Sequence, residues 1–145
     1  MTAVDSDILI YSHRRDSDWH EPAKQAVKQI AESGAGWAIP WPCIHEFLGI
    51  ATHPKIYGPP TTVEQAIRQV ELWFASPSLT MVGERVGYWE ILKNTLAAGK
   101  IRGPRVHDAR IYSICLENGV KTLMSADRDF NRFSGLKVVN PLIGA

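Results

Sequence analysis

The sequence predicts an α/β fold, in which a central, mainly parallel sheet is flanked by helices. Short apolar segments of strand length alternate along the chain with longer segments of helical period, as in βαβ units. Helix start and stop signals bracket the longer segments. With 145 residues, 45% of them hydrophobic, the chain is long enough for one core without metal or disulfide cross-links. We expect a single domain over residues 1–145.

Five short apolar segments are the predicted strands. They are Thr2–Asp5, Gly36–Pro40, Leu79–Val82, Lys121–Met124 and Lys137–Asn140. Because helical segments separate the earlier ones, we expect them to pair in parallel.

The first long helical segment lies between the first two predicted strands. Asp18 and Glu21 have the spacing of a capping box, and Gly34 is a stop signal. The apolar residues between these signals recur at helical spacing: Ala23, Val27, Ile30 and Ala31. An amphipathic helix is therefore expected here.

Two further apolar stripes predict helices in the middle of the chain. The pattern from Thr61 to Glu64 repeats the capping box, and Pro77 ends the segment. Its stripe consists of Val63, Ile67, Val70 and Phe74. A later stripe, closed by Gly99, consists of Val86, Trp89, Leu92 and Leu96.

Two prolines mark the starts of the remaining helices. Pro42 and Pro104 each stand where a helix should begin, because proline is well tolerated in the first turn. Asn118 and Gly119 form a strong stop signal for the helix that begins near Pro104.

The composition limits the possible function classes. Lys and Arg number 16 against 15 Asp and Glu, a net charge of +1, so any nucleic-acid binding must come from local placement of charge. Cys43 and Cys115 are far apart and lack zinc-site spacing, so we expect two buried, reduced thiols. An acidic N-terminal segment and the absence of a long apolar run predict a cytoplasmic protein with no membrane partner.

The acidic residues are arranged so that several of them should converge. Asp5 ends the first predicted strand and Asp127 follows the fourth, so both should project from the carboxyl edge of the sheet, where such folds bind ligands. Glu46 and Asp108 each follow a helix-starting proline by four residues. This spacing places each about one turn into a helix whose amino end faces the same edge.

Converging carboxylates repel one another unless a cation lies between them. Hard oxygen donors without thiolates or paired imidazoles favour magnesium (Mg²⁺) or Mn²⁺ over Zn²⁺. Such an ion activates water and stabilises charge on a phosphoryl oxygen, which makes phosphodiester hydrolysis the natural reaction. Taken singly, each acid has a purely structural alternative as a helix cap, a turn residue or a solvated helix position.

Four sequence strings resemble those of PIN-domain nucleases, and in particular the VapC-type toxins of bacterial toxin–antitoxin pairs. They are AVDSDILIY (3–11), PWPCIHEFL (40–48), VHDA (106–109) and SADRDF (125–130). The resemblance covers nearly the whole chain, including the segment 135–141. It implies a PIN-like α/β/α fold and a toxic, Mg²⁺-dependent endoribonuclease that forms a homodimer and is neutralised by a cognate antitoxin.

The resemblance also implies roles for individual residues. Asp5 and Asp108 match the principal metal ligands. Glu46 matches the acid that holds metal or orients the attacking water, and Asp127 the acid that completes the site directly or through water. The residues expected to support these ligands are Asp7, which stands where the family often has asparagine, Ser125, where threonine is common, and Asp129.

A polyanionic substrate requires cations beside the acids. The expected RNA-binding residues are Arg14, Lys100, Arg102, Arg105, Arg110 and Arg128. His45 and His107 each precede a motif acid, but adjacent helix residues point about 100° apart, so we expect them to belong to the core or to the surroundings of the site.

Three other functions are weighed against the toxin hypothesis. A PIN nuclease for RNA processing would use the same site residues. An aspartate-based phosphatase would use Asp5 as nucleophile, but that class needs threonine or glycine soon after the second aspartate, and residues 8–10 supply neither. A receiver-like signalling domain needs an aspartate after a central strand, whereas Gly83 and Glu84 follow Leu79–Val82.

Overall fold

A five-stranded parallel sheet forms the centre of the molecule. The computed structural model describes residues 1–143, so the last two residues of the predicted domain lie outside it. The sheet has the order β3-β2-β1-β4-β5, and every neighbouring pair is parallel. The strands are β1 (Thr2–Val4), β2 (Trp37–Pro40), β3 (Leu79–Val82), β4 (Thr122–Met124) and β5 (Lys137–Val139). The predicted α/β fold with a parallel sheet is confirmed, and each strand boundary lies within one residue of its prediction.

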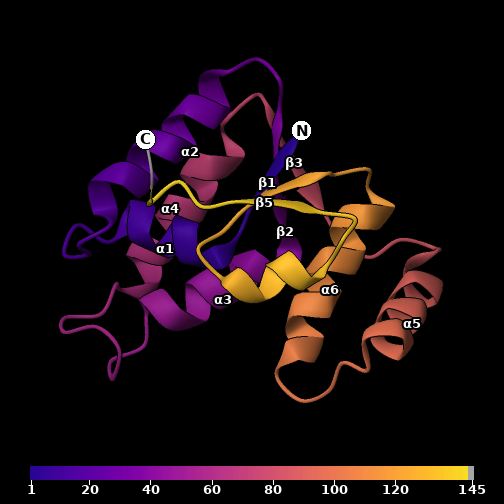
Figure 1. The fold of residues 1–145 in the computed structure, drawn as a ribbon. Helices are drawn as coiled ribbons and strands as arrows, with labels where there is room; N and C mark the ends of the chain where they lie inside the picture. Colours follow the sequence, from indigo (N-terminus) through magenta and orange to yellow (C-terminus); the bar gives the residue numbers. More distant parts are fainter. Residues whose placement is uncertain (144–145) are drawn as a thin grey trace.

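Helices cover both faces of this sheet. They are α1 (Ser6–His13), α2 (His20–Glu32), α3 (Trp41–Ala51), α4 (Val63–Phe74), α5 (Tyr88–Gly99), α6 (Arg105–Glu117) and the short 3₁₀ helix η1 (Arg128–Arg132). Figure 1 shows α1, α2 and α4 on one side of the sheet and α5 and α6 on the other. The central strands are consequently buried on both faces: Ala3, Val4, Ala38, Ile39 and Leu123 are all fully buried.

The predicted helix starts at the two prolines are confirmed, whereas the predicted caps of α2 and α4 differ from those in the structure. Pro42 lies in the first turn of α3, Pro104 caps α6, and Gly119 ends α6 with a φ of 71°. At α2, by contrast, the predicted Asp18 capping box does not form, because Trp19 occupies the cap position without a side-chain bond. The first turn of α2 is held instead by a contact with α1, between His20 Nδ1 and the Tyr11 carbonyl at 3.0 Å.

The capping box of α4 forms one residue later than predicted. The Thr62 hydroxyl accepts a hydrogen bond from the Gln65 amide at 3.1 Å, and the Gln65 side chain accepts one from the Thr62 amide at 3.0 Å. Thr61 is buried instead, with its hydroxyl 3.0 Å from His13 Nε2.

The buried face of α4 also differs from the predicted stripe. Ala66, Val70 and Trp73 are buried, while three of the four predicted stripe residues are exposed: Val63 (61%), Ile67 (49%) and Phe74 (42%). The Trp73 ring packs edge-on against buried Phe47 of α3 at 4.8 Å, which turns this face of α4 to the core.

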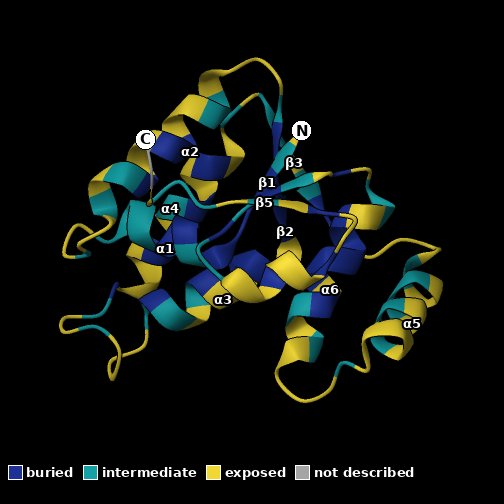
Figure 2. Cartoon of the chain, viewed as in Figure 1, coloured by how far each residue is buried: buried dark blue, intermediate teal, exposed yellow. Residues whose placement is uncertain are grey.

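Helix α5 lies at the outside of the molecule and packs mainly on α6. It has no fully buried residue (Figure 2), and the predicted stripe is only half buried at Leu92 and Leu96. Val86 and Trp89 of the same stripe are exposed. Within residues 1–143 no helix has the length and apolar character needed to span a membrane, and Cys43 and Cys115 are buried free thiols, as predicted.

Candidate active site

The sheet order brings the predicted acids to one edge. β1 and β4 are adjacent and parallel, so Asp5, the residue after β1, and Asp127, shortly after β4, lie at the same carboxyl edge. Asp108 is in the first turn of α6, and Asp129 is in the first turn of η1. Elements that are far apart in the sequence therefore place their carboxylates in the same region of the molecule.

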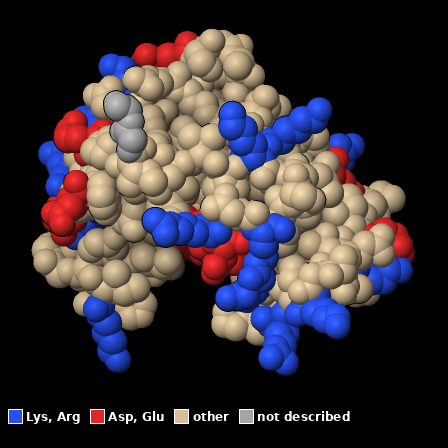
Figure 3. All heavy atoms as spheres, in the orientation of Figure 1, with Lys and Arg blue, Asp and Glu red and all other residues tan. Residues whose placement is uncertain are grey.

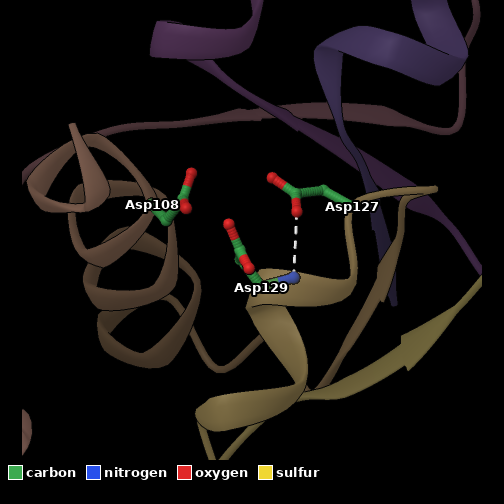
Figure 4. A group of neighbouring side chains, drawn as sticks. All are labelled: Asp108, Asp127 and Asp129. Atoms are coloured by element: carbon green, nitrogen blue, oxygen red, sulfur yellow. Dashed lines mark hydrogen bonds between the residues drawn. The ribbon is translucent and has the colours of Figure 1, made fainter.

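Three carboxylates form the tightest group. Asp108, Asp127 and Asp129 each offer one oxygen atom, and these atoms all lie within 4.8 Å of one another. In Figure 4 the three side chains, from α6 and from the start of η1, point into the same space. The Asp127 side chain also accepts a hydrogen bond from the Asp129 amide at 2.9 Å, so it caps η1.

The composition of this group fits a hard divalent cation. All three donors are carboxylate oxygens, and ligand distances of about 2.1 Å around Mg²⁺ place any two ligand atoms within about 4.2 Å of one another. The three oxygen atoms lie within 4.8 Å of one another, so a small movement of the side chains would bring them around one ion that also keeps some of its waters. Asp5 and Glu46 do not join this group among residues 1–143. Asp129 was expected only to support the ligands, whereas the structure places one of its carboxylate oxygens within the group.

Asp5 is the most deeply buried of the acids, only 5% exposed. One of its oxygens accepts hydrogen bonds from the Ser6 amide at 2.7 Å and the Cys43 thiol at 3.6 Å. The other accepts from the Ser125 hydroxyl at 2.7 Å. These donors hold the carboxylate in one orientation.

Ser125 and Asp7 connect Asp5 to the β4–η1 segment. The Ser125 hydroxyl, which donates to Asp5, accepts from the Asp127 amide at 3.0 Å. The two oxygens of Asp7 accept from the Ile8 amide at 2.7 Å and the Ala126 amide at 3.0 Å. The start of α1 and the start of η1 are thereby tied together.

Glu46 lies on α3 at the solvent side of Asp5. The Ser6 hydroxyl donates to it at 3.4 Å and also lies 3.5 Å from an Asp5 oxygen, so one hydroxyl joins the two acids. Glu46 and Asp108 line a cavity of about 390 Å³ together with His45, His107 and Arg110. Both histidines lie at this cavity and not in the buried core, so they belong to the surroundings of the site.

The acids raise one another's pKa values. Burial raises the pKa of Asp5, and the charge of Asp127 adds to this effect. Burial and the charge of Asp5 raise the pKa of Asp7 to about 7, and raise that of Glu46 as well. Burial, followed by the charges of Asp127 and Asp5, raises the pKa of Asp108 to about 6. A bound divalent cation would remove this mutual repulsion.

Basic side chains surround the acids on the outer surface (Figure 3). Lys100, Arg102 and Arg105 line one groove, which Arg132 also lines. Two other predicted cations lie beside the acids. Arg110 forms an ion pair with Glu84 at 3.0 Å, and Arg128 is exposed on η1 next to Asp127.

Arg14, also predicted to bind RNA, has partners elsewhere. Its guanidinium pairs with Asp16, with Nε 2.9 Å from a carboxylate oxygen, and lies over the Tyr57 ring at 4.2 Å. It also donates to the Thr61 hydroxyl at 3.3 Å. This network anchors the segment between α3 and α4.

Known proteins are similar to this chain in both sequence and fold. The PIN domain family model matches residues 2–136. Ribonuclease VapC48 of Mycobacterium tuberculosis is 31% identical over 140 residues, covering 97% of each chain. The structure of VapBC2 from Rickettsia felis bound to a promoter DNA fragment matches with a TM-score of 0.67 at 18% identity, covering 96% of this chain and 97% of that one. The Sarcin-Ricin loop cleaving toxin VapC20 of Mycobacterium tuberculosis matches with a TM-score of 0.68 at 13% identity, covering 92% and 95%. The chain belongs to the PIN-domain family and, within it, to the VapC ribonucleases.

Proposed function

We propose that this chain is a toxic, metal-dependent endoribonuclease that hydrolyses RNA phosphodiester bonds and is neutralised by a cognate antitoxin. The observation that carries the proposal is the group of all-oxygen donors formed by Asp108, Asp127 and Asp129 beside the buried Asp5. The ribonuclease names of the relatives over nearly the full chain support the reaction.

The proposed metal is Mg²⁺, with Mn²⁺ as an alternative. Asp5 and Asp108 are the principal ligands in this proposal, and Glu46 and Asp127 assist them. When bound, the ion supplies a polarised water and a positive charge opposite the phosphoryl oxygens. Asp129 belongs with the ligands because its carboxylate faces Asp108 and Asp127 (Figure 4).

The surrounding residues have separate tasks in this proposal. Ser125 and Asp7 hold Asp5 and the start of η1 in position through the hydrogen bonds described above. Glu46 lies at the exposed side of Asp5, where its carboxylate is placed to orient water. Arg128 holds the RNA backbone at the rim, since phosphate contacts fix the register of a bound nucleic acid. Arg110 and Arg14 are weaker RNA contacts because both guanidinium groups are already paired, with Glu84 and Asp16 respectively.

An antitoxin protein and a second copy of this chain are the proposed protein partners. Solved relatives are described as VapBC complexes and as a toxin–antitoxin complex from Klebsiella pneumoniae. Exposed apolar residues on α4, Ile67, Leu72 and Phe74, offer a surface that a protein partner would cover. Trp41 of α3 extends this surface, packed against Phe74 at 5.9 Å. Size-exclusion chromatography of the chain alone tests the homodimer.

The sequence after Asp7 argues against an aspartate-based phosphatase. That class needs threonine or glycine soon after the second aspartate, and residues 8–10 supply neither. A PIN nuclease for RNA processing would share the chemistry proposed here. Expression of the chain in cells distinguishes the two. A toxin should arrest growth, and coexpression of a neighbouring antitoxin gene should relieve the arrest, whereas a processing enzyme should show neither effect.

The reaction is tested by incubating the purified protein with total cellular RNA. We expect cleavage with Mg²⁺ and none with EDTA. Asp108→Asn should abolish cleavage, whereas the matched control Asp18→Asn, at an exposed carboxylate outside the site, should not. Cleavage that persists in EDTA or in the Asp108 variant contradicts the proposal.

A further inference from the structure

Cys43 is a fully buried residue that contacts the candidate active site and has no role in the function proposed above. It lies in the first turn of α3 and is a free thiol, 0% exposed. Its Sγ atom is 3.6 Å from Asp5 Oδ1. An ionised carboxylate can only accept hydrogen bonds, so the thiol is the donor in this contact. A side chain of the hydrophobic core thus touches an acid that we propose as a principal metal ligand.

Helix α3 approaches Asp5 at two positions that are one helical turn apart. Cys43 and Glu46 are three residues apart, which places them on the same face of the helix. Cys43 donates to Asp5 directly. Glu46 reaches Asp5 through the Ser6 hydroxyl, which lies 3.4 Å from Glu46 and 3.5 Å from Asp5. The same helix therefore holds the buried side of Asp5 with a thiol and borders its solvent side with a carboxylate.

The hydrogen-bond donors to Asp5 come from three parts of the chain. The Ser6 amide, 2.7 Å from Oδ1, belongs to the next residue and moves with Asp5, so it does not fix Asp5 relative to other elements. Ser125, which follows β4, donates to the other oxygen at 2.7 Å. In the described part of the chain, Cys43 is the one donor to Oδ1 from outside the segment that carries Asp5. Cys43 and Ser125 thus hold the two oxygens from different elements, and this opposes rotation of the carboxylate.

The thiol keeps its proton in this position and so remains a donor. Burial, followed by the charges of Asp5 and Glu46, raises the pKa of Cys43 well above its ordinary value. A thiolate here would add a third negative charge beside the two acids. A thiol is also a weaker donor than a hydroxyl, so it orients the carboxylate while withdrawing little of the charge that attracts a hard cation.

We propose that Cys43 is a positioning residue for RNA cleavage, an inference that rests on the proposed function: its thiol holds Asp5 Oδ1 and keeps this carboxylate in one orientation for metal binding. Cys43 touches neither the metal nor the RNA in this proposal and acts only through Asp5. Groups that orient metal ligands in this way contribute about 10- to 100-fold to metal affinity or activity.

Infrared spectroscopy of the S–H stretch tests the hydrogen bond without relying on activity. This band lies in a part of the spectrum free of other protein bands, and its frequency falls when the thiol donates a hydrogen bond. The chain has two cysteines, so either Cys43→Ala or Cys115→Ala is enough to assign both bands. In EDTA the Cys43 band should lie below the Cys115 band, because within residues 1–143 the Cys115 thiol makes no hydrogen bond. Asp5→Asn, which removes the charge of the acceptor, should raise the Cys43 band and leave the Cys115 band unchanged. Saturating Mg²⁺ should also raise the Cys43 band, because a bound cation withdraws charge from Asp5.

Two matched alanine variants separate positioning from packing. Cys43 and Cys115 are both 0% exposed, so Cys43→Ala and Cys115→Ala each remove one buried sulfur atom and should lower the melting temperature by similar amounts. Cys43→Ala should also raise the Mg²⁺ concentration needed for half-maximal cleavage of total RNA by about 10-fold. Cys115→Ala should leave this concentration unchanged.

Three results would overturn the proposal. They are a Cys43 band at the frequency of the Cys115 band, a Cys43 band that does not respond to Asp5→Asn, and a Mg²⁺ requirement that is the same in the two alanine variants. A different result separates the proposed function from the role of Cys43. A Cys43 band that responds to Asp5→Asn but not to Mg²⁺, in a protein that cleaves no RNA, contradicts the proposed metal-dependent nuclease and leaves the hydrogen bond to Asp5 in place.

Discussion

Replacing Asp7 with asparagine should make the stability of the metal-free protein depend less on pH. The pKa of Asp7 is raised from 3.8 to about 7 by burial and by the charge of Asp5. Because this pKa is higher in the folded than in the unfolded chain, stability is greatest where Asp7 is protonated and is lost as the pH rises from about 4 through about 7. The full loss in the free energy of unfolding over this pH range is about 4 kcal/mol.

The asparagine variant removes this loss but also weakens a hydrogen bond. The two Asp7 oxygens accept from the Ile8 and Ala126 amides, and an asparagine side chain has only one oxygen to offer. Leaving one amide without its acceptor costs about 1–3 kcal/mol at every pH. Asp7→Asn should therefore be no more stable than the wild type at pH 4.5 and more stable by about 1–3 kcal/mol at pH 8.

Urea unfolding in EDTA at both pH values measures this effect. The informative quantity is the change in the stability difference between the two proteins, about 3 kcal/mol from pH 4.5 to pH 8, because the hydrogen-bond cost cancels. Asp18→Asn, at an exposed carboxylate, is the matched control. An Asp7→Asn effect on stability that is the same at both pH values refutes the raised pKa of Asp7.

Three further predictions concern the site. Asp129→Asn should lower RNA cleavage by about 10- to 100-fold because the residue lies with Asp108 and Asp127; an unchanged rate in the total-RNA assay would remove it from the metal site. Ser125→Ala should lower the free energy of unfolding by about 1–3 kcal/mol, and Ser125→Thr should restore both stability and cleavage, since it keeps the hydroxyl that donates to Asp5; failure of the threonine to rescue would argue against that hydrogen bond. Mg²⁺ should raise the melting temperature more at pH 8 than at pH 5, because protons compete for Asp108, whose pKa is about 6; an equal shift at both pH values in scanning fluorimetry would exclude that competition.

The strands and the edge that carries the acids were predictable from the sequence because they depend on local patterns. Apolar segments between turn signals set the strand boundaries, and the residue after a parallel strand must lie at the carboxyl edge of the sheet. Asp5 and Asp127 could be placed in this way from their positions after strands alone. The prolines before α3 and α6 likewise placed Glu46 and Asp108 near helix starts.

Helix faces and individual contacts were less predictable because they depend on tertiary packing. Thr61 and Thr62 are the same residue type and are equally good helix caps, and the choice between them follows from the contact of Thr61 with His13. Val63 and Ile67 are apolar and helically spaced, yet packing of Trp73 against α3 turns them to solvent. The place of Asp129 in the acid group could not be read from spacing alone, since it requires the direction in which η1 leaves β4.

The Ser125–Asp5 hydrogen bond joins residues 120 positions apart, and it has a consequence for the newly made protein. Because β1 lies between β2 and β4, the second oxygen of Asp5 acquires its hydrogen-bond donor only when Ser125, which follows β4, has been synthesised. A nascent or truncated chain that ends before Thr122 lacks β4, Asp127 and Asp129 together. The candidate site is therefore incomplete in any shortened chain that lacks residues 122–129, even where β1, β2 and Asp5 are present.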